Sequence, residues 1–222
     1  WTIGGGLNWL DQYWSTKISD PILIGTVFIF SITLISLFID LPFSIYRNFI
    51  LEHKFGFNRM TVKTFIGDFF IEIAQGLIFM IPLSYAILYL MNLEAIRDFW
   101  WIYVWITFSL FLLTMSWIYP TFIAPWKNKF TPLENTVLKN RITSLLERTG
   151  FKSDGIYVMD GSKRSSHGNA YFTGIGKNKR IVFFDTLLEG LEDKEIEAIL
   201  AHEPGHFHHI HSRQRIFNLL IF

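Results

Sequence analysis

Cysteine is absent from the 222 residues of this sequence. Disulfides, thiolate metal sites and a cysteine nucleophile are therefore excluded within it, although the redox compartment stays open. Net charge is also nearly absent, at +1, so no overall electrostatic field favours nucleic acid as a partner. Half of the residues are hydrophobic and 18% are aromatic, and the mean hydropathy is +0.30. This composition indicates a membrane protein rather than a soluble domain.

The two ends of the sequence lack the usual signs of a complete chain. The first residue is Trp1 rather than methionine, and the last residue, Phe222, lies inside an apolar run over 216–222. We expect this run to be the start of a further transmembrane helix and the chain to be a fragment of a longer protein.

Three apolar stretches are long enough to cross a bilayer, which requires about 20 helical residues. They cover roughly 21–39, 70–91 and 99–119, so residues 1–119 are predicted to form a membrane region. Asp20 and Pro21 predict the N-cap and first position of the first helix, and Asp40 and Pro42 predict its end. The alternative, buried helices of a large soluble core, is less favoured because the stretches have almost no polar face.

The positions of lysine and arginine predict the orientation in the membrane. Basic residues are concentrated in 41–68 and 120–215, whereas 1–20 and 92–98 hold one each, Lys17 and Arg97. The positive-inside rule then places the two basic segments on the cytoplasmic side. Residues 120–215 are accordingly predicted to form a domain that faces the cytoplasm.

Inside that domain the pattern predicts a small α+β fold. Thr131–Glu134 reads as a capping box before a helix over 133–149. Strands are expected at 155–159, 169–175 and 180–185, with a hairpin turn at 176–179, followed by a last helix from about 192.

The last predicted helix carries the strongest chemical signal, the pattern His202, Glu203 and His206. On a helix, histidines four residues apart project about 40° from one another and one turn apart, which allows both imidazoles to bind one zinc ion. Glu203, beside them, is placed to take a proton from the attacking water. Ile196, Ile199 and Leu200 are expected to form an apolar stripe that holds the helix against the domain.

A zinc site of this kind needs a third protein ligand, and the sequence provides no convincing one. His208, His209 and His211 are better explained as polar residues near a membrane surface, since His209 lies about 10.5 Å further along a straight helix than His202. Glu72 is an acidic residue within a predicted span, and such residues are candidate functional groups. Because it is near the end of its helix, the alternative is that it simply lies at the membrane interface.

Four motifs, in this order, resemble those of the type I CAAX prenyl protease family. They are Leu41–Tyr46, Glu52–Asn58, Asp160–Phe172 and the helix with His202, Glu203 and His206. The resemblance extends over about 20–222. It implies a fold of multi-pass membrane helices enclosing a chamber, with a zincin-like α+β metalloprotease domain.

The resemblance also implies a function, an integral-membrane zinc endopeptidase that removes the C-terminal tripeptide of prenylated proteins. The membrane would be the endoplasmic reticulum or inner nuclear membrane in a eukaryote, and the cytoplasmic membrane in a prokaryote. It implies one zinc per chain, with a glutamate beyond Phe222 as third ligand. Asn169 and Ala170 match the family's edge-strand motif, which pairs with the backbone of the substrate peptide.

Pro204 departs from the family pattern, because zincins carry a bulky apolar residue after the catalytic glutamate. Proline in a helix interior removes one hydrogen bond, here to the carbonyl of Leu200, at a cost of about 3 kcal/mol. We expect it to move Glu203 away from helical geometry and to weaken the metal site. Two other readings therefore stay open: a membrane quality-control protease of the heat-shock type, and a degenerate relative without catalytic activity.

Overall fold

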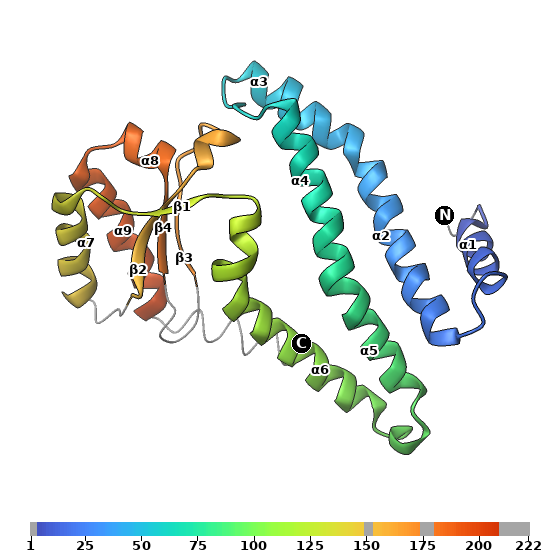
Figure 1. The fold of residues 1–222 in the computed structure, drawn as a ribbon. Helices are drawn as coiled ribbons and strands as arrows, with labels where there is room; N and C mark the ends of the chain where they lie inside the picture. Colours follow the sequence, from blue (N-terminus) through green and yellow to red (C-terminus); the bar gives the residue numbers. More distant parts are fainter. Residues whose placement is uncertain (1–3, 149–152, 174–179, 209–222) are drawn as a thin grey trace. The chain divides into compact units, whose positions relative to one another are not determined.

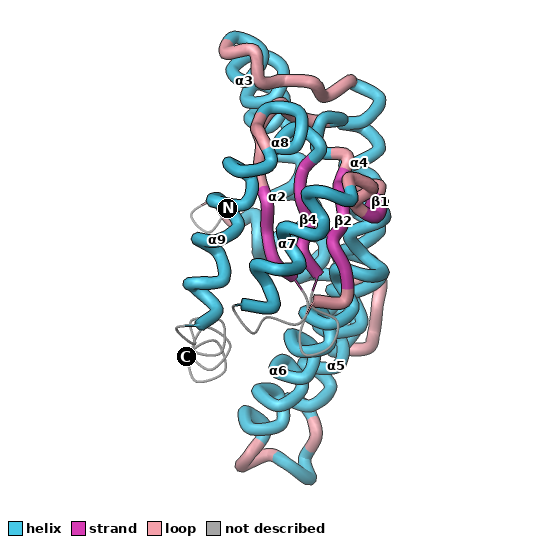
Figure 2. Tube along the Cα trace, turned by 90° about the vertical axis from the view of Figure 1, so that its left-hand side faces the viewer, coloured by secondary structure: helices cyan, strands magenta, loops and turns pink. Residues whose placement is uncertain are grey.

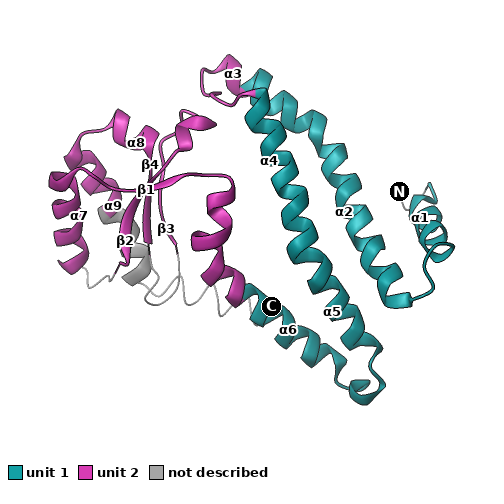
Figure 3. Ribbon diagram, viewed as in Figure 1, with its two compact units in different colours: residues 1–51, 62–112 teal, residues 52–61, 113–222 magenta. Residues whose placement is uncertain are grey.

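The computed structural model describes residues 4–148, 153–173 and 180–208, and within 201–208 it describes only the helical backbone. The chain divides into two compact units, shown in different colours in Figure 3. The first unit contains Trp1–Leu51 and Val62–Leu112, and the second contains Glu52–Thr61 and Leu113–Phe222. The short segment Glu52–Thr61 thus belongs to the same unit as the predicted catalytic region.

The first unit is entirely helical in the residues that the structure describes (Figure 1). Its α-helices are α1 (Gly6–Ser15), α2 (Pro21–Ile45), α4 (Val62–Gln75), α5 (Ile81–Asn92) and the first part of α6 (Trp100–Ile118). Helices α2 and α5 pack together, and a Cβ added to Gly25 of α2 would lie only 2.8 Å from Leu88 Cδ1 of α5. A small residue at this position lets the two helices approach closely, as is common in membranes.

Three continuous helices in the described part of the chain are long and apolar enough to span a bilayer: Pro21–Lys54, Val62–Asn92 and Trp100–Trp126. The predicted stretches 21–39 and 70–91 lie within the first two helices, and the stretch 99–119 lies within the third except for its first residue. In each helix, only 6% of the most apolar 18-residue segment is buried by protein. We therefore expect lipid to surround the remaining residues of these segments.

The start of α2 is as predicted, but its predicted end is wrong. Asp20 Oδ1 accepts hydrogen bonds from the amides of Ile22 and Leu23, at 2.8 and 3.2 Å, and Pro21 occupies the first helical position. The helix nevertheless continues through Pro42 to Ile45 and into a π-helical turn. Proline keeps a φ that suits a helix and removes one hydrogen bond, whereas ending the helix in apolar surroundings would leave several carbonyls unsatisfied.

The second unit contains a four-stranded sheet with the strand order β1-β2-β4-β3. The strands are β1 (Phe130–Pro132), β2 (Gly155–Met159), β3 (Ala170–Thr173) and β4 (Arg180–Phe184). Strands β2 and β4 are parallel, while β1 pairs with β2 and β3 pairs with β4 in antiparallel fashion. The last pairing agrees with the predicted hairpin, whose turn at 176–179 lies outside the described residues.

Helices α7 (Thr136–Arg148) and α9 (Asp193–His208) cover one face of this sheet, and α8 (Asp185–Gly190) follows β4 (Figure 2). The core between them is apolar throughout, with Ile142, Ile181, Phe183 and Leu200 fully buried. Since burying one such side chain contributes about 1.5–3 kcal/mol, this cluster fixes α9 on the sheet.

The predicted capping box at Thr131–Glu134 is wrong, because Thr131 and Pro132 belong to strand β1. Asn135 caps α7 instead, with its Oδ1 atom accepting the amides of Val137 and Leu138 at 3.1 Å each. The amide of Leu133 donates to the carbonyl of Ile156, so the segment stays paired with β2 up to that residue. Pairing with the sheet therefore overrides the local helix signal, and α7 begins later than predicted.

Candidate active site

Helix α9 is fixed in place before it reaches the histidine pattern. Ile196 and Leu200 are 1% and 0% exposed, as the predicted apolar stripe requires, but Ile199 is 39% exposed and does not belong to it. At the N-terminus, Glu195 Oε2 accepts the amide of Glu192 at 2.9 Å, which is half of a capping box. Glu197 is within 4 Å of Arg141 and Arg148 of α7, two surface ion pairs that add modest support.

The backbone around His202, Glu203 and His206 is helical, as predicted, because α9 extends from Asp193 to His208. The expected departure of Glu203 from helical geometry does not occur, since α9 continues through Pro204. The fixed φ of proline is compatible with a helix, so the ring removes one hydrogen bond without ending the element. His208 is the last residue of α9, and His209 and His211 lie outside the described residues.

Two imidazoles one helical turn apart fit zinc as part of a ligand set, because neutral histidine is a preferred ligand of this metal. In the part of the chain that the structure describes with side chains, no group of three potential metal-binding residues is found. Glu72 lies in α4 with an exposed side chain, and it forms no such group. The residues present therefore fit two of the ligands of a zinc site.

Strand β3 forms one edge of the sheet and lies next to α9, which it contacts. The carbonyl of Asn169 accepts the amide of Phe184 at 2.9 Å, so the backbone of Asn169 faces β4. Because antiparallel pairing alternates, the amide and carbonyl of Ala170 face the opposite side, away from β4. The amide of Ala170 donates to Asn169 Oδ1 at 2.8 Å, so the asparagine side chain covers this edge position.

The loop before β3 is held by the segment Glu52–Thr61. His167 stacks on Phe57 with 4.2 Å between the ring centroids, and its Nε2 atom lies 3.2 Å from Glu52 Oε2. Backbone hydrogen bonds of 3.0 Å from Ser166 N to Phe57 O and 3.1 Å from Arg59 N to Arg164 O join the same two segments. We call these contacts the 52–61 brace; they fix the position at which β3 begins.

Two further contacts hold the loop from the other side. Thr186 Oγ1 donates to the carbonyl of His167 at 2.9 Å, and Asp185 accepts the amide and the hydroxyl of Ser162. At Gly168 a side chain would be crowded, because an added Cβ would lie 3.2 Å from the Cα of Leu187. The loop 160–169 is thus fixed on α8 as well as on the 52–61 brace.

Sequence reasoning did not identify Glu52, Phe57 and His167 as a group. Each lies in a motif that carries the family resemblance, but nothing in their spacing shows that they meet across more than 100 residues of chain. The structure reveals the contact, through these side-chain and backbone contacts and through the isolated antiparallel bridge between Asn58 and Ser165.

Tyr171, in the edge strand β3, is the one described group of this region with a shifted pKa. Burial raises its pKa, and the neighbouring Tyr119 raises it further. Its hydroxyl contacts Met159 Sδ at 3.8 Å. The phenol therefore stays neutral well above physiological pH and acts as a packing group.

Apolar spans, a small α+β unit and a helix with the His-Glu-x-x-His pattern are together typical of membrane metallopeptidases. Residues 1–129 match the family model described as CAAX prenyl protease N-terminal, five membrane helices, and residues 132–222 match peptidase family M48. The chain belongs to the CAAX prenyl protease family. As a family of metallopeptidases, M48 implies a metal ion, generally zinc.

Individual relatives agree with this assignment. The chain is 45% identical over 189 residues to CAAX prenyl protease 1 of Saccharomyces cerevisiae, covering 85% of this chain and 40% of the relative. It is 39% identical over 180 residues to the human CAAX prenyl protease 1 homolog, covering 80% of this chain and 38% of the relative. The crystal structure of S. mikatae Ste24p matches with a TM-score of 0.86 and 36% identity, over 96% of this chain and 51% of that one. This chain spans about half the length of these relatives, or less.

Proposed function

We propose that this chain supplies the catalytic helix and the substrate-binding strand of a zinc-dependent membrane endopeptidase that cleaves near the C-terminus of prenylated proteins. The observation that carries the proposal is the contact between α9, which bears His202, Glu203 and His206, and the edge strand β3. An extended peptide that pairs with β3 would lie beside the helix that carries the catalytic residues. The names of the relatives supply the substrate class.

His202 and His206 would hold the zinc ion, with a third ligand supplied by the protein beyond Phe222. When bound, zinc lowers the pKa of water and polarises the scissile carbonyl. Glu203 takes the proton of the attacking water and then delivers it to the leaving amine. Ala170 binds the substrate backbone through its outward-facing amide and carbonyl, and Asn169 contributes its side chain at the same edge; such an edge recognises an extended chain without requiring one side chain.

The second unit is proposed to face the cytoplasm. The concentration of basic residues in 41–68 and 120–215 supports this orientation, and so do the apolar spans between them. Prenylated C-termini on cytoplasmic proteins would then reach the edge strand from the same side of the bilayer.

Glu203→Gln in the full-length protein tests the proposal. We expect hydrolysis of a quenched prenylated peptide to fall by about 10²–10⁴-fold, because the amide cannot accept the proton of water. Bound zinc, measured by elemental analysis, should stay stoichiometric. The matched control is Glu197→Gln, the same chemical change on α9, which should lower stability by at most about 1 kcal/mol and leave the rate within about twofold.

Full hydrolysis by Glu203→Gln would refute the role of Glu203. Wild-type protein that binds no zinc and cleaves nothing would support the degenerate relative instead. Cleavage of unprenylated membrane peptides at the same rate as prenylated ones would favour the quality-control role.

A further inference from the structure

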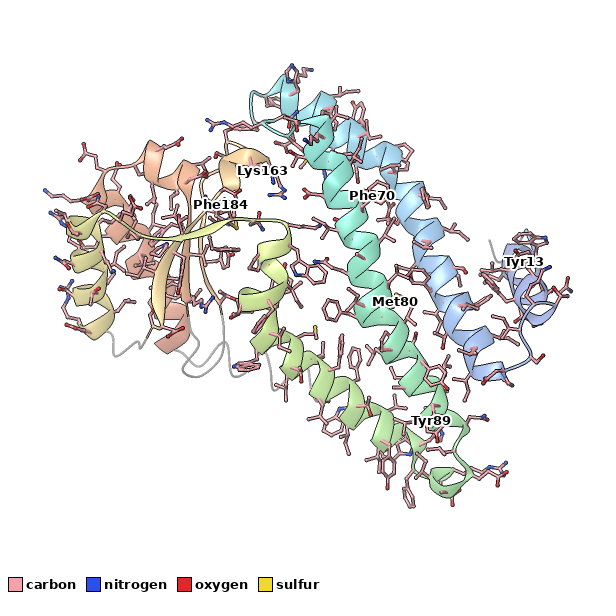
Figure 4. All side chains as sticks on the ribbon, in the orientation of Figure 1. Tyr13, Phe70, Met80, Tyr89, Lys163 and Phe184 are labelled. Atoms are coloured by element: carbon pink, nitrogen blue, oxygen red, sulfur yellow. The ribbon has the colours of Figure 1, made fainter. Side chains whose placement is uncertain are left out.

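A basic pocket outside the candidate active site lies on the second unit. Its volume is about 450 Å³, and its lining includes Trp126, Lys127, Asn128, Lys129, Asp160 and Lys163. Lys163 belongs to the short 3-10 helix Gly161–Lys163 that follows β2 (Figure 4). The volume is in the range of sites for small ligands, and three ammonium groups against one carboxylate favour an anion.

The framework of this pocket is held by hydrogen bonds that use its acidic and amide groups. Asp160 Oδ1 accepts the amide of Lys129 at 2.6 Å. Arg164 donates to Asn128 Oδ1 and to the carbonyl of Lys127, at 2.7 Å each. The carboxylate of Asp160 is thereby directed to the backbone, while the side chains of Lys129 and Lys163 are exposed. The turn that carries the lysines is fixed before any ligand arrives.

The pocket is at the end of a predicted membrane span. The helix Trp100–Trp126 has 27 residues and is about 40 Å long, which exceeds the hydrocarbon thickness of about 30 Å. The exposed rings of Trp101 and Tyr119 are about 27 Å apart along it and suit the two interfaces. A π-helical turn, Tyr119–Ile123, and a 3-10 turn, Ala124–Trp126, follow α6, so the pocket-lining Trp126 is the last residue of this helix. Tryptophan at the end of an apolar span is suited to the headgroup region.

We propose that this pocket binds the phosphate headgroup of an anionic phospholipid in the leaflet where the helix ends. Lys129 and Lys163 supply the charge, Lys127 and Asn128 line the pocket beside them, and the exposed ring of Trp126 lies against the lipid at the interface. Basic pockets at the ends of membrane helices have the chemistry to recognise such headgroups, and lysine is an effective ligand for phosphate. This site is separate from α9 and β3, so it does not depend on the proposed peptidase activity.

The test is lipid retention by the detergent-solubilised full-length protein, measured by native mass spectrometry during titration with phosphatidic acid or phosphatidylcholine. We expect Lys129→Gln/Lys163→Gln to weaken retention of phosphatidic acid about 30-fold, which is roughly fivefold per lysine. Retention of phosphatidylcholine should not change. The matched control, Lys139→Gln/Lys194→Gln, removes the same charge from exposed positions on α7 and α9 and should change retention less than twofold.

Equal weakening by the two double variants would overturn the proposal, because overall charge rather than the pocket would then attract the lipid. Displacement of phosphatidic acid by millimolar inorganic phosphate would assign the pocket to a free anion and would also overturn it. If Lys129→Gln/Lys163→Gln retained phosphatidic acid normally but lost binding of a glutamate-rich peptide, the ligand of the pocket would be an acidic protein instead, which would also overturn the proposal. If the double variant does not fold, Lys163→Gln alone carries the test, with an expected loss of about fivefold.

Discussion

His167 is the residue that connects the beginning of β3 to a distant part of the chain. Its ring contacts Phe57 and Glu52, and its carbonyl accepts from Thr186. The ring and Glu52 are partly exposed, with 55% and 32% of their side-chain surfaces accessible, so the polar contact between them contributes little by itself. The aromatic contact is therefore the larger part of the 52–61 brace.

For His167→Ala in the full-length protein, we expect the free energy of unfolding to fall by about 1–2 kcal/mol. The KM for a peptide substrate should rise while kcat stays nearly constant, because the change displaces the edge strand rather than the catalytic helix. His167→Phe keeps the stacking and should restore most of the affinity. His53→Ala, an exposed histidine in the neighbouring helix Glu52–Lys54, serves as control. A fall in kcat with no change in KM would contradict this positioning role of His167.

Pro204 is the residue that sets this chain apart from the expected pattern. Helix α9 contains it without ending, so its effect must be the loss of one hydrogen bond near the proposed metal ligands rather than a break. Pro204→Leu should therefore raise the melting temperature, the zinc affinity and the peptidase rate of the full-length protein together. Ile199→Leu, an exposed change on the same helix, is the control and should alter none of them. Unchanged zinc affinity in Pro204→Leu would show that the proline is neutral for the site.

At the scale of elements, β3 has two sides with different tasks. The backbone of Tyr171 faces β4, while that of Ala170 faces outward. Ala170→Pro should therefore leave the sheet intact, since proline is tolerated on an outer edge. It removes the amide that donates to Asn169 Oδ1 in this structure and is proposed to donate to the substrate, so kcat/KM should fall by about tenfold. Tyr171→Pro removes a hydrogen bond to β4 and should lower the free energy of unfolding by about 1–3 kcal/mol.

Thermal unfolding and peptide kinetics on these two variants separate the sides of the strand. If Ala170→Pro cleaved substrate at the normal rate, the edge would have no part in binding.

The sequence predicted those elements whose signals are local. Strands β2 and β4 were predicted because each is a short apolar run bounded by turn residues, and the start of α2 because Asp20 and Pro21 are adjacent. Helix α8 was not predicted, because six residues after a strand give no periodicity. The start of α7 was wrong because sheet pairing at Thr131 competes with helix capping there. In the candidate site, the helix was predictable from His202 and His206, whereas the 52–61 brace depends on contacts that no local pattern encodes.

At the scale of the whole molecule, the predicted orientation can be tested because the sequence contains no cysteine. In the full-length protein without other cysteines, Lys194→Cys should react with a membrane-impermeant maleimide added from the cytoplasmic side. Glu94→Cys, in the short connection between α5 and α6, should react only from the opposite side. Labelling of both positions from one side would refute the arrangement of spans.

The second unit is assembled from two separate stretches of chain, Glu52–Thr61 and the part from Leu113 onward. Between them, the polypeptide runs through helices suited to cross the bilayer twice. An expression clone that starts at Leu113 would lack one support of the proposed peptide-binding edge, however well the remaining core folded. Because its two stretches flank apolar helices, the second unit cannot be separated from them whole by a single cut in the chain.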